Sequence, residues 1–185
     1  MNWHSGKWQK QWKGGQSKMT QTKKIVLTAL FCGIALISSS FLSIPLGPIR
    51  AFPIQHTINV LLAVLLGTKY AVSGAFIVAL LRNILGLGTI FAFPGSLVGA
   101  LIAGIVYKKS NKLTLAAIGE TFGTGIIGSL LCYPIAIFIL GREATLFFVM
   151  PSFLASALIG AIISLALLKV LSTKEQLWEA IKANN

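Results

Sequence analysis

Three polar side chains with acid–base or hydrogen-bonding chemistry lie close together in the sequence, at Gln55, His56 and Asn59. Imidazole exchanges protons near neutral pH, and the amides both donate and accept hydrogen bonds. His56 and Asn59 are three residues apart, so a helix that begins after Pro53 places them on one face. This spacing predicts a surface that contacts a polar ligand. The alternative is a structural role, in which His56 is hydrogen-bonded at an interface between helices.

Two charged residues, Arg82 and Glu120, lie inside apolar stretches. Asn83 follows Arg82 directly, and Thr121 and Thr124 follow Glu120. Charge inside a membrane is costly, so such residues usually face a bundle interior or a cavity. Either Arg82 and Glu120 form a structural ion pair, or one or both reach a ligand. A rise of about 1.5 Å per residue puts Arg82 about 20 Å from the inner membrane edge and Glu120 about 10 Å from it. Glu120 is therefore expected to lie deep for a site near the outer face.

Signals for catalysis and metal binding are weak. Cys32 and Cys132 fall in apolar runs, where free cysteine usually packs as a small hydrophobic residue, and there is no C-x-x-C motif. Ser96 has no convincing base, and no phosphate-binding glycine loop is present. We expect no catalytic residue, no metal, no cofactor and no ATPase activity in this chain. An intramembrane enzyme that uses His56 or Glu120 is the alternative from another class.

The composition predicts a membrane protein made of helices. Apolar residues form 55% of the 185-residue chain and charged residues 11%, against about a quarter charged in a soluble domain. The long apolar runs show no alternation, which disfavours strands. We therefore predict an all-α bundle of six transmembrane helices, from residues 25–46, 53–67, 70–87, 91–107, 113–140 and 146–171. A spanning helix needs about 20 residues, so the second segment is tilted, interrupted or completed by the preceding loop.

The lysines predict the orientation of the bundle. A net charge of +12 could suit nucleic acid, but the lysines are confined to the ends and to loops near Lys69 and Lys108–Lys112, which is typical of cytoplasmic loops. The opposite connections contain only Arg50 and Arg142, with Glu143. We expect a multi-pass protein of the cell membrane, with both termini cytoplasmic, embedded in the lipid bilayer and without a nucleic-acid partner.

Three regions follow from these patterns. Residues 1–22 are polar, with lysines and three tryptophans, and are expected to be a basic, disordered tail; the alternative is contact with anionic lipid headgroups. Residues 23–172 are expected to form the membrane domain, and residues 173–185 a cytoplasmic tail. Met19 leads directly into the first apolar segment and is a second candidate for the natural start.

Four stretches together carry a resemblance to a known family. They are Phe-Pro-Ile-Gln-His-Thr-Ile-Asn-Val at residues 52–60, Leu-Arg-Asn-Ile-Leu-Gly at 81–86, Phe-Pro-Gly-Ser at 93–96, and Gly-Glu-Thr with Gly-Thr-Gly-Ile-Ile-Gly at 119–128. Over residues 19–171 the chain resembles the substrate-binding S components of energy-coupling-factor (ECF) transporters. It is most similar to the ThiW family, which is associated with the thiazole precursor of thiamine.

The resemblance implies a six-helix, S-component-like bundle that captures a vitamin or its precursor near the outer face. It also implies two kinds of partner, a membrane scaffold subunit and two cytoplasmic ATPase subunits. In such proteins a ridge of small residues on the first helix meets the scaffold. The matching positions are Ala29 and Gly33, where glycine replaces the second alanine. Residues 44–53 correspond to a loop that covers the site, and transport is proposed to topple the S component in the membrane.

The implied substrate is hydroxyethylthiazole, which needs hydrogen bonds to its hydroxyl and ring nitrogen and apolar walls for the ring. The side chains expected to bind it are Gln55, His56, Asn59, Arg82, Asn83, Glu120 and Thr124, with Phe52, Phe91, Phe93 and Tyr133 as candidate aromatic walls. An S component for thiamine or its pyrimidine precursor is the nearest alternative. A structural or assembly membrane protein without a small ligand is another.

Overall fold

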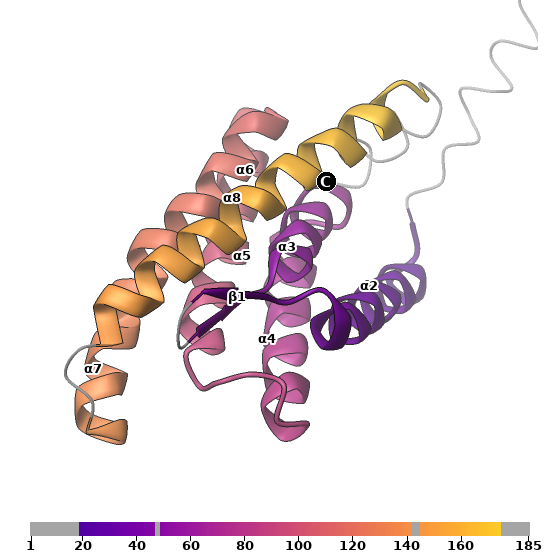
Figure 1. Ribbon diagram of the computed structural model, residues 1–185. Helices are drawn as coiled ribbons and strands as arrows, with labels where there is room; N and C mark the ends of the chain where they lie inside the picture. Colours follow the sequence, from indigo (N-terminus) through magenta and orange to yellow (C-terminus); the bar gives the residue numbers. More distant parts are fainter. Residues whose placement is uncertain (1–18, 47–48, 142–144, 175–185) are drawn as a thin grey trace, which may run out of the picture.

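The computed structural model of the protein describes residues 19–46, 49–141 and 145–174, which form a helical bundle with one short hairpin (Figure 1). The elements are α2 (Gln21–Phe41), β1 (Ile44–Leu46), β2 (Ile49–Ala51), α3 (Pro53–Leu65), α4 (Thr68–Ile84), α5 (Ala92–Ser110), α6 (Leu113–Phe122), η1 (Gly123–Gly128), α7 (Ser129–Leu140) and α8 (Thr145–Ser172). The π-helical turn η1 runs without a break from α6 into α7. The described residues therefore form six helical segments.

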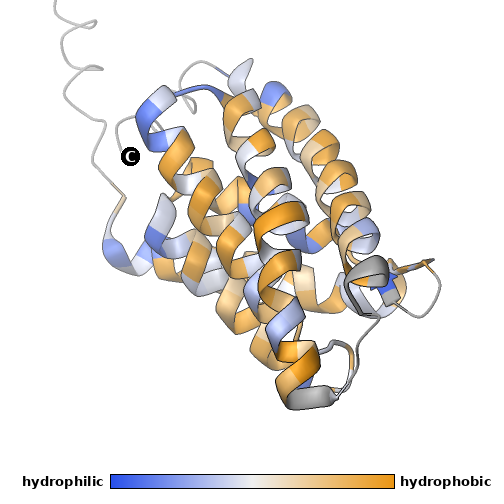
Figure 2. Ribbon diagram, turned by 90° about the vertical axis from the view of Figure 1, so that its left-hand side faces the viewer, coloured by the Kyte–Doolittle hydropathy of each residue, from blue (hydrophilic) through white to orange (hydrophobic). Residues whose placement is uncertain are grey.

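Helix length and hydropathy agree with the expected all-α membrane protein. Among the described residues, three helices are long and apolar enough to cross a membrane, namely Gln21–Phe41, Leu113–Phe138 and Val149–Ser172. Figure 2 shows hydrophobic residues along most of each helix. The 13-residue α3 is about 20 Å long, shorter than a hydrocarbon core of about 30 Å. Six membrane spans and the orientation of the termini stay predictions.

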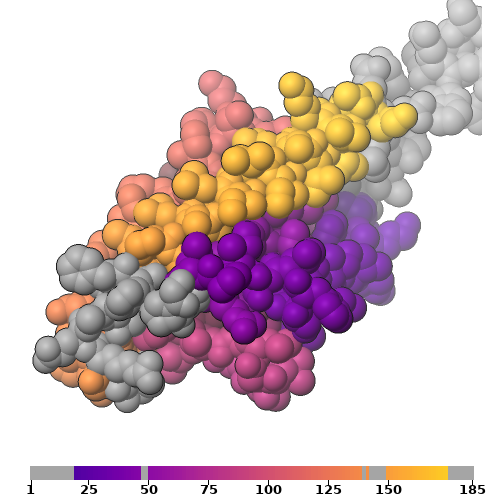
Figure 3. All heavy atoms as spheres, viewed as in Figure 1, coloured from indigo at the N-terminus to yellow at the C-terminus, as the bar shows by residue number. Residues whose placement is uncertain are grey.

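The hairpin between α2 and α3 is a feature that the sequence analysis missed. Its two three-residue strands pair in antiparallel register. Helix α2 ends at Phe41, and Ile44, which precedes Pro45, lies in strand β1, because proline favours extended geometry in the residue before it. Strand β2 packs against α8, and the two segments lie side by side in the space-filling view (Figure 3). The backbone N–H of Phe52 then donates to Oγ of Ser156 at 3.0 Å, which fixes the entry into α3 on α8.

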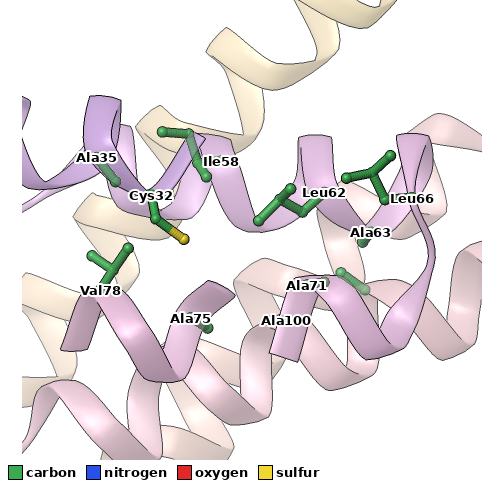
Figure 4. Packing of buried hydrophobic residues seen from close by; sticks show 11 residues of the cluster. Cys32, Ala35, Ile58, Leu62, Ala63, Leu66, Ala71, Ala75, Val78 and Ala100 are labelled. Carbon is green, nitrogen blue, oxygen red and sulfur yellow. The ribbon is translucent and has the colours of Figure 1, made fainter. Parts of the chain in front are cut away.

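Helix α3 is the centre of the bundle, and nearly all of its residues are buried. It packs against α2, α4, α5 and α8. The main core cluster joins Ile58 and Leu62 of α3 with small residues of the neighbouring helices, including Ala71, Ala75 and Ala100 (Figure 4). Small residues allow close approach of helix backbones in a membrane. Polar side chains on α3 are consequently held in a tightly packed interior.

The lysines of the described chain gather at one end of the bundle. They occupy the starts of α2, α4 and α6, the end of α5 and the end of α8, and these helix ends lie on the upper side of Figure 1. The residues are Lys23, Lys24, Lys69, Lys108, Lys109, Lys112, Lys169 and Lys174. Arg50 lies on the hairpin, where the chain enters α3. This one-sided distribution is the one that the positive-inside rule requires if the lysine end is cytoplasmic.

Candidate functional site

Glu120 on α6 is the centre of a buried polar group. It is the only acidic residue in the part of the chain that the structure describes, and its exposed fraction is 0%. Its Oε1 accepts hydrogen bonds from Nδ2 of Asn59 at 3.0 Å and from Oγ1 of Thr124 at 3.2 Å. Nδ1 of His56 lies 2.8 Å from the same oxygen, as a hydrogen bond or, with a protonated ring, an ion pair. We call His56, Asn59, Glu120 and Thr124 the carboxylate cluster.

Local structure explains why these four side chains meet. Pro53 is the first residue of α3, a position that proline favours because its missing N–H would have no helical partner there. Helix α3 therefore starts early enough to direct His56 and Asn59 to one face, as predicted. Glu120 lies in the last turn of α6, and Thr124 lies four residues later in η1. Helical spacing of three or four residues puts both pairs on neighbouring positions of a face.

Helix α5 closes the carboxylate cluster with its backbone. The carbonyl of Gly95 accepts from Thr124 at 3.1 Å, and the carbonyl of Ser96 accepts from Asn59 at 3.3 Å. A Cβ built on Gly99 would overlap the Thr124 hydroxyl and lie 2.5 Å from Oε2 of Glu120. A side chain at this position would therefore displace the carboxylate. Gly95 and Gly99 are four residues apart on α5, a spacing that allows close approach of helix backbones.

One oxygen of the carboxylate cluster is unused. Oε2 of Glu120 is buried and has no hydrogen-bond partner among the described residues. A buried acceptor without a donor typically costs about 1–3 kcal/mol, so the site is suited to a ligand hydroxyl or N–H. Within the same residues, no three His, Cys, Asp or Glu side chains come together as metal ligands would.

Arg82 on α4 forms a second buried polar group. Its guanidinium stacks on the Phe52 ring, 3.5 Å from the ring centroid. Nη1 donates to Oε1 of Gln55, and Nη2 donates to the carbonyl of Leu87 at 3.2 Å. Nε is buried and lacks a partner among the described residues. We call Phe52, Gln55, Arg82 and Leu87 the arginine cluster.

The predicted alternative of an ion pair between Arg82 and Glu120 is wrong. Glu120 pairs with His56, whereas Arg82 is bound by an amide, a carbonyl and an aromatic ring. The adjacent residues Gln55 and His56 of α3 contact one charged group each. The expected depth of Glu120 in the membrane stays a prediction.

Three predicted site residues lie outside both clusters. Nδ2 of Asn83 donates to the carbonyls of Ala79 and Thr89, at 2.8 and 3.1 Å, and so stabilises the turn after α4. The Phe93 ring contacts that of Phe76, with centroids 5.8 Å apart. Tyr133 is 44% exposed on α7. Of the other candidate walls, Phe52 stacks on Arg82 and Phe91 packs in the core against α7.

The predicted partner ridge lies on an open face of α2. Ala29 is exposed, and nothing lies within 4 Å of a Cβ built on Gly33. Around them, the large apolar side chains of Leu30, Ile34 and Ile37 are 56%, 45% and 65% exposed. The face is thus free for lipid or a partner helix, and its role as an interface stays a prediction.

Apolar helices around buried hydrogen-bonding groups define a helical membrane protein with an internal polar site. Residues 25–174 match the family model of the thiamine-precursor transporter protein, ThiW, and the chain belongs to this family. Its role is therefore in transport, and the suspected family is confirmed. Both clusters lie within the matched residues. No curated protein and no solved structure matches the chain.

Proposed function

We propose that the protein is the substrate-capturing membrane subunit of an ECF-type transporter and that it binds hydroxyethylthiazole, the thiazole precursor of thiamine. The family supplies the class of substrate, a thiamine precursor. The observation that carries the choice among precursors is the unpaired, buried Oε2 of Glu120.

Hydroxyethylthiazole carries one hydrogen-bond donor and one acceptor that complement the unpaired Oε2 of Glu120 and Nε of Arg82. Its hydroxyl is one donor, which suits Oε2 of Glu120, and its ring nitrogen is one acceptor, which suits Nε of Arg82. The Arg82 guanidinium already stacks on an aromatic ring, Phe52, and a heteroaromatic ring is favoured at such a surface for the same reason. In this proposal Gln55, His56, Asn59 and Thr124 orient the two charged groups.

The alternative precursors fit these atoms less well. In thiamine the thiazole nitrogen is alkylated, so that ring cannot accept a hydrogen bond from Arg82. The pyrimidine precursor carries an amino group in addition to its hydroxyl and so offers more donors than the one unpaired acceptor. Unmatched polar groups in a buried site lower affinity strongly. The thiazole is therefore the preferred substrate.

Access to the clusters requires movement of the segment before α3. Phe52 lies directly on Arg82, and the hairpin that precedes it packs on α8. We assign strands β1 and β2, with Phe52 and Pro53, as the cover of the site, held by the Phe52–Arg82 contact and by the Phe52–Ser156 hydrogen bond. Substrate that binds Arg82 would compete with the first of these contacts and so couple binding to opening.

The decisive experiment is calorimetric binding to the purified protein in nanodiscs with hydroxyethylthiazole, thiamine and hydroxymethylpyrimidine. One-to-one binding of the thiazole is expected. In Glu120→Gln, affinity should fall about tenfold or more, because a hydrogen bond to a charged group contributes about 1.5–3 kcal/mol. Tyr133→Phe is the matched control, since Tyr133 is 44% exposed on α7 and belongs to neither cluster. Absence of binding in folded protein would refute the proposal, and turnover would favour an intramembrane enzyme.

The ECF assignment is tested separately by co-purification with a scaffold subunit and its two ATPase subunits. Gly33→Trp is expected to prevent assembly, because it fills the open ridge beside Ala29. Ile162→Trp on α8, at a position that is 68% exposed, is the matched control and should assemble normally. If both variants assembled equally well, the ridge at Ala29 and Gly33 would be excluded as the interface with the scaffold subunit.

A further inference from the structure

A cavity of about 200 Å³ lies at the lysine end of the bundle, between the end of α3, the start of α4 and the end of α5. Its walls include Gly67, Thr68 and Lys69 from one side and Tyr107 and Lys108 from the other. No residue of the carboxylate or arginine cluster contributes to it. It is therefore a separate site, which the proposed transport function does not use.

The cavity carries positive charge that no described carboxylate neutralises. Lys69 and Lys108 come from different helices and are exposed. Neither forms an ion pair among the described residues, where the only carboxylate belongs to Glu120 and is bonded to His56. Two lysines that converge on one cavity attract an anion.

The start of α4 adds hydrogen-bond donors to the same cavity. The first intrahelical bond runs from the N–H of Ala71 to the carbonyl of Gly67, so the N–H groups of residues 68–70 have no helical acceptor. No side chain caps this helix and no acidic residue lies in its first turn. Unpaired N–H groups at the start of a helix favour an anion such as phosphate.

Two further residues shape the cavity for a ligand. A Cβ on Gly104 would lie 2.6 Å from Oγ1 of Thr68, so glycine here lets α5 approach the start of α4. Lys108 lies one helical turn further along α5, on the same side. Tyr107 is only 3% exposed, and its hydroxyl has no hydrogen-bond partner in the described residues although the residue lines the cavity. The site thus combines cations, amides and an unpaired tyrosine hydroxyl.

We propose that this cavity binds a phosphate group, carried either by an anionic phospholipid headgroup or by a small soluble phosphate. Lysine is a common phosphate ligand, and its charge supplements the amide donors of the α4 start. The position also fits, because the lysine ends of the helices are where lipid phosphates lie at a membrane surface. Apolar walls at Ala63 and Leu66 suit the non-polar part of such a molecule.

The test compares two variants with the same loss of charge. Lys69→Gln/Lys108→Gln removes the cavity lysines, whereas Lys109→Gln/Lys112→Gln removes two lysines of the same end that do not line the cavity. Native mass spectrometry of the detergent-purified protein counts bound phosphatidylglycerol across a titration. Affinity is expected to fall about thirtyfold in the first variant and to change less than about threefold in the second.

A second arm separates the two sources of phosphate. The unfolding temperature is measured in the presence of inorganic phosphate. In the control, chloride replaces phosphate at the same ionic strength. Stabilisation by inorganic phosphate would identify a soluble ligand, and phosphatidylglycerol binding alone would identify the lipid. If the first double variant does not fold, Tyr107→Phe serves instead, with an expected loss of about fivefold for one hydrogen bond. Equal effects of the two double variants, or unchanged binding in the cavity variants, would overturn the proposal.

Discussion

The carboxylate cluster and the arginine cluster are built on adjacent residues of α3, yet they connect different parts of the protein. Glu120 is bonded by side chains from α3 and η1, against the backbone of α5. Arg82 is bonded by Gln55 of α3, by the turn after α4 and by the ring of Phe52. One cluster joins helical segments that pack together in the core, and the other includes the residue before α3 and the turn after α4.

This difference indicates that the two clusters have separate structural roles. Contacts among packed helices break only when much of the core unfolds. Contacts at helix ends and in loops break by local opening, which has a lower free energy. The carboxylate cluster is therefore suited to stabilise the bundle and present a fixed acceptor. The arginine cluster is suited to hold the entry segment closed. The following substitutions test whether the two clusters behave so differently.

The largest effect is expected for Glu120→Ala. It removes the shared acceptor of His56, Asn59 and Thr124 and leaves their donors buried. Leaving a buried hydrogen-bonding group without its partner typically costs about 1–3 kcal/mol, and the whole bundle should lose stability. Thermal unfolding in detergent measures this loss. Glu120→Gln, which keeps an acceptor oxygen, should lose less. Wild-type stability of Glu120→Ala would show that the cluster does not stabilise the core.

Arg82→Ala should have a smaller and more local effect. It removes the hydrogen bonds from Arg82 to Gln55 and Leu87. A hydrogen bond from a charged donor contributes about 1.5–3 kcal/mol, and we expect water to replace part of this loss near the helix end. We expect trypsin to cleave faster after Arg50 in strand β2, because the segment before α3 should open more often. Arg82→Lys keeps the charge but loses the planar fork and should be intermediate. Global unfolding as severe as in Glu120→Ala would contradict the comparison.

The contrast between the clusters also explains what could be predicted from the sequence. The apolar runs predicted the helices. The three-residue spacing predicted that His56 and Asn59 share one face of a helix, and the structure confirms this because both contact Glu120. The partner of Glu120 could not be predicted, because His56 lies 64 residues away and only packing brings them together. The hairpin was missed because its strands are only three residues long. Ligand roles for these residues stay predictions.

Gly99→Ala tests how tightly α5 closes the carboxylate cluster. The new methyl group would overlap Thr124 and crowd Glu120, and overpacking of this kind costs about 1–3 kcal/mol. Gly33→Ala is the matched control, because nothing lies within 4 Å of its Cβ. The control should be neutral or up to about 1 kcal/mol more stable, since alanine favours the helix. Equal unfolding temperatures for the two variants would show that α5 can move away from the cluster.

Phe52→Leu is expected to have the smallest effect on stability. It keeps an apolar side chain but removes the ring beneath the Arg82 guanidinium, a contact worth about 1 kcal/mol or somewhat more when shielded from water. Tryptic cleavage after Arg50 should rise while the unfolding temperature changes little.

The double variant Phe52→Leu/Arg82→Ala decides whether the two residues act as one closure. If they do, its cleavage rate should match that of Arg82→Ala alone, because the second substitution removes a contact that is already lost. Phe52→Leu combined with Glu120→Gln should instead give additive effects, since Phe52 has no contact with the carboxylate cluster among those described. Additivity in the first pair would mean that the hairpin is held elsewhere, with Ser156 as the next candidate.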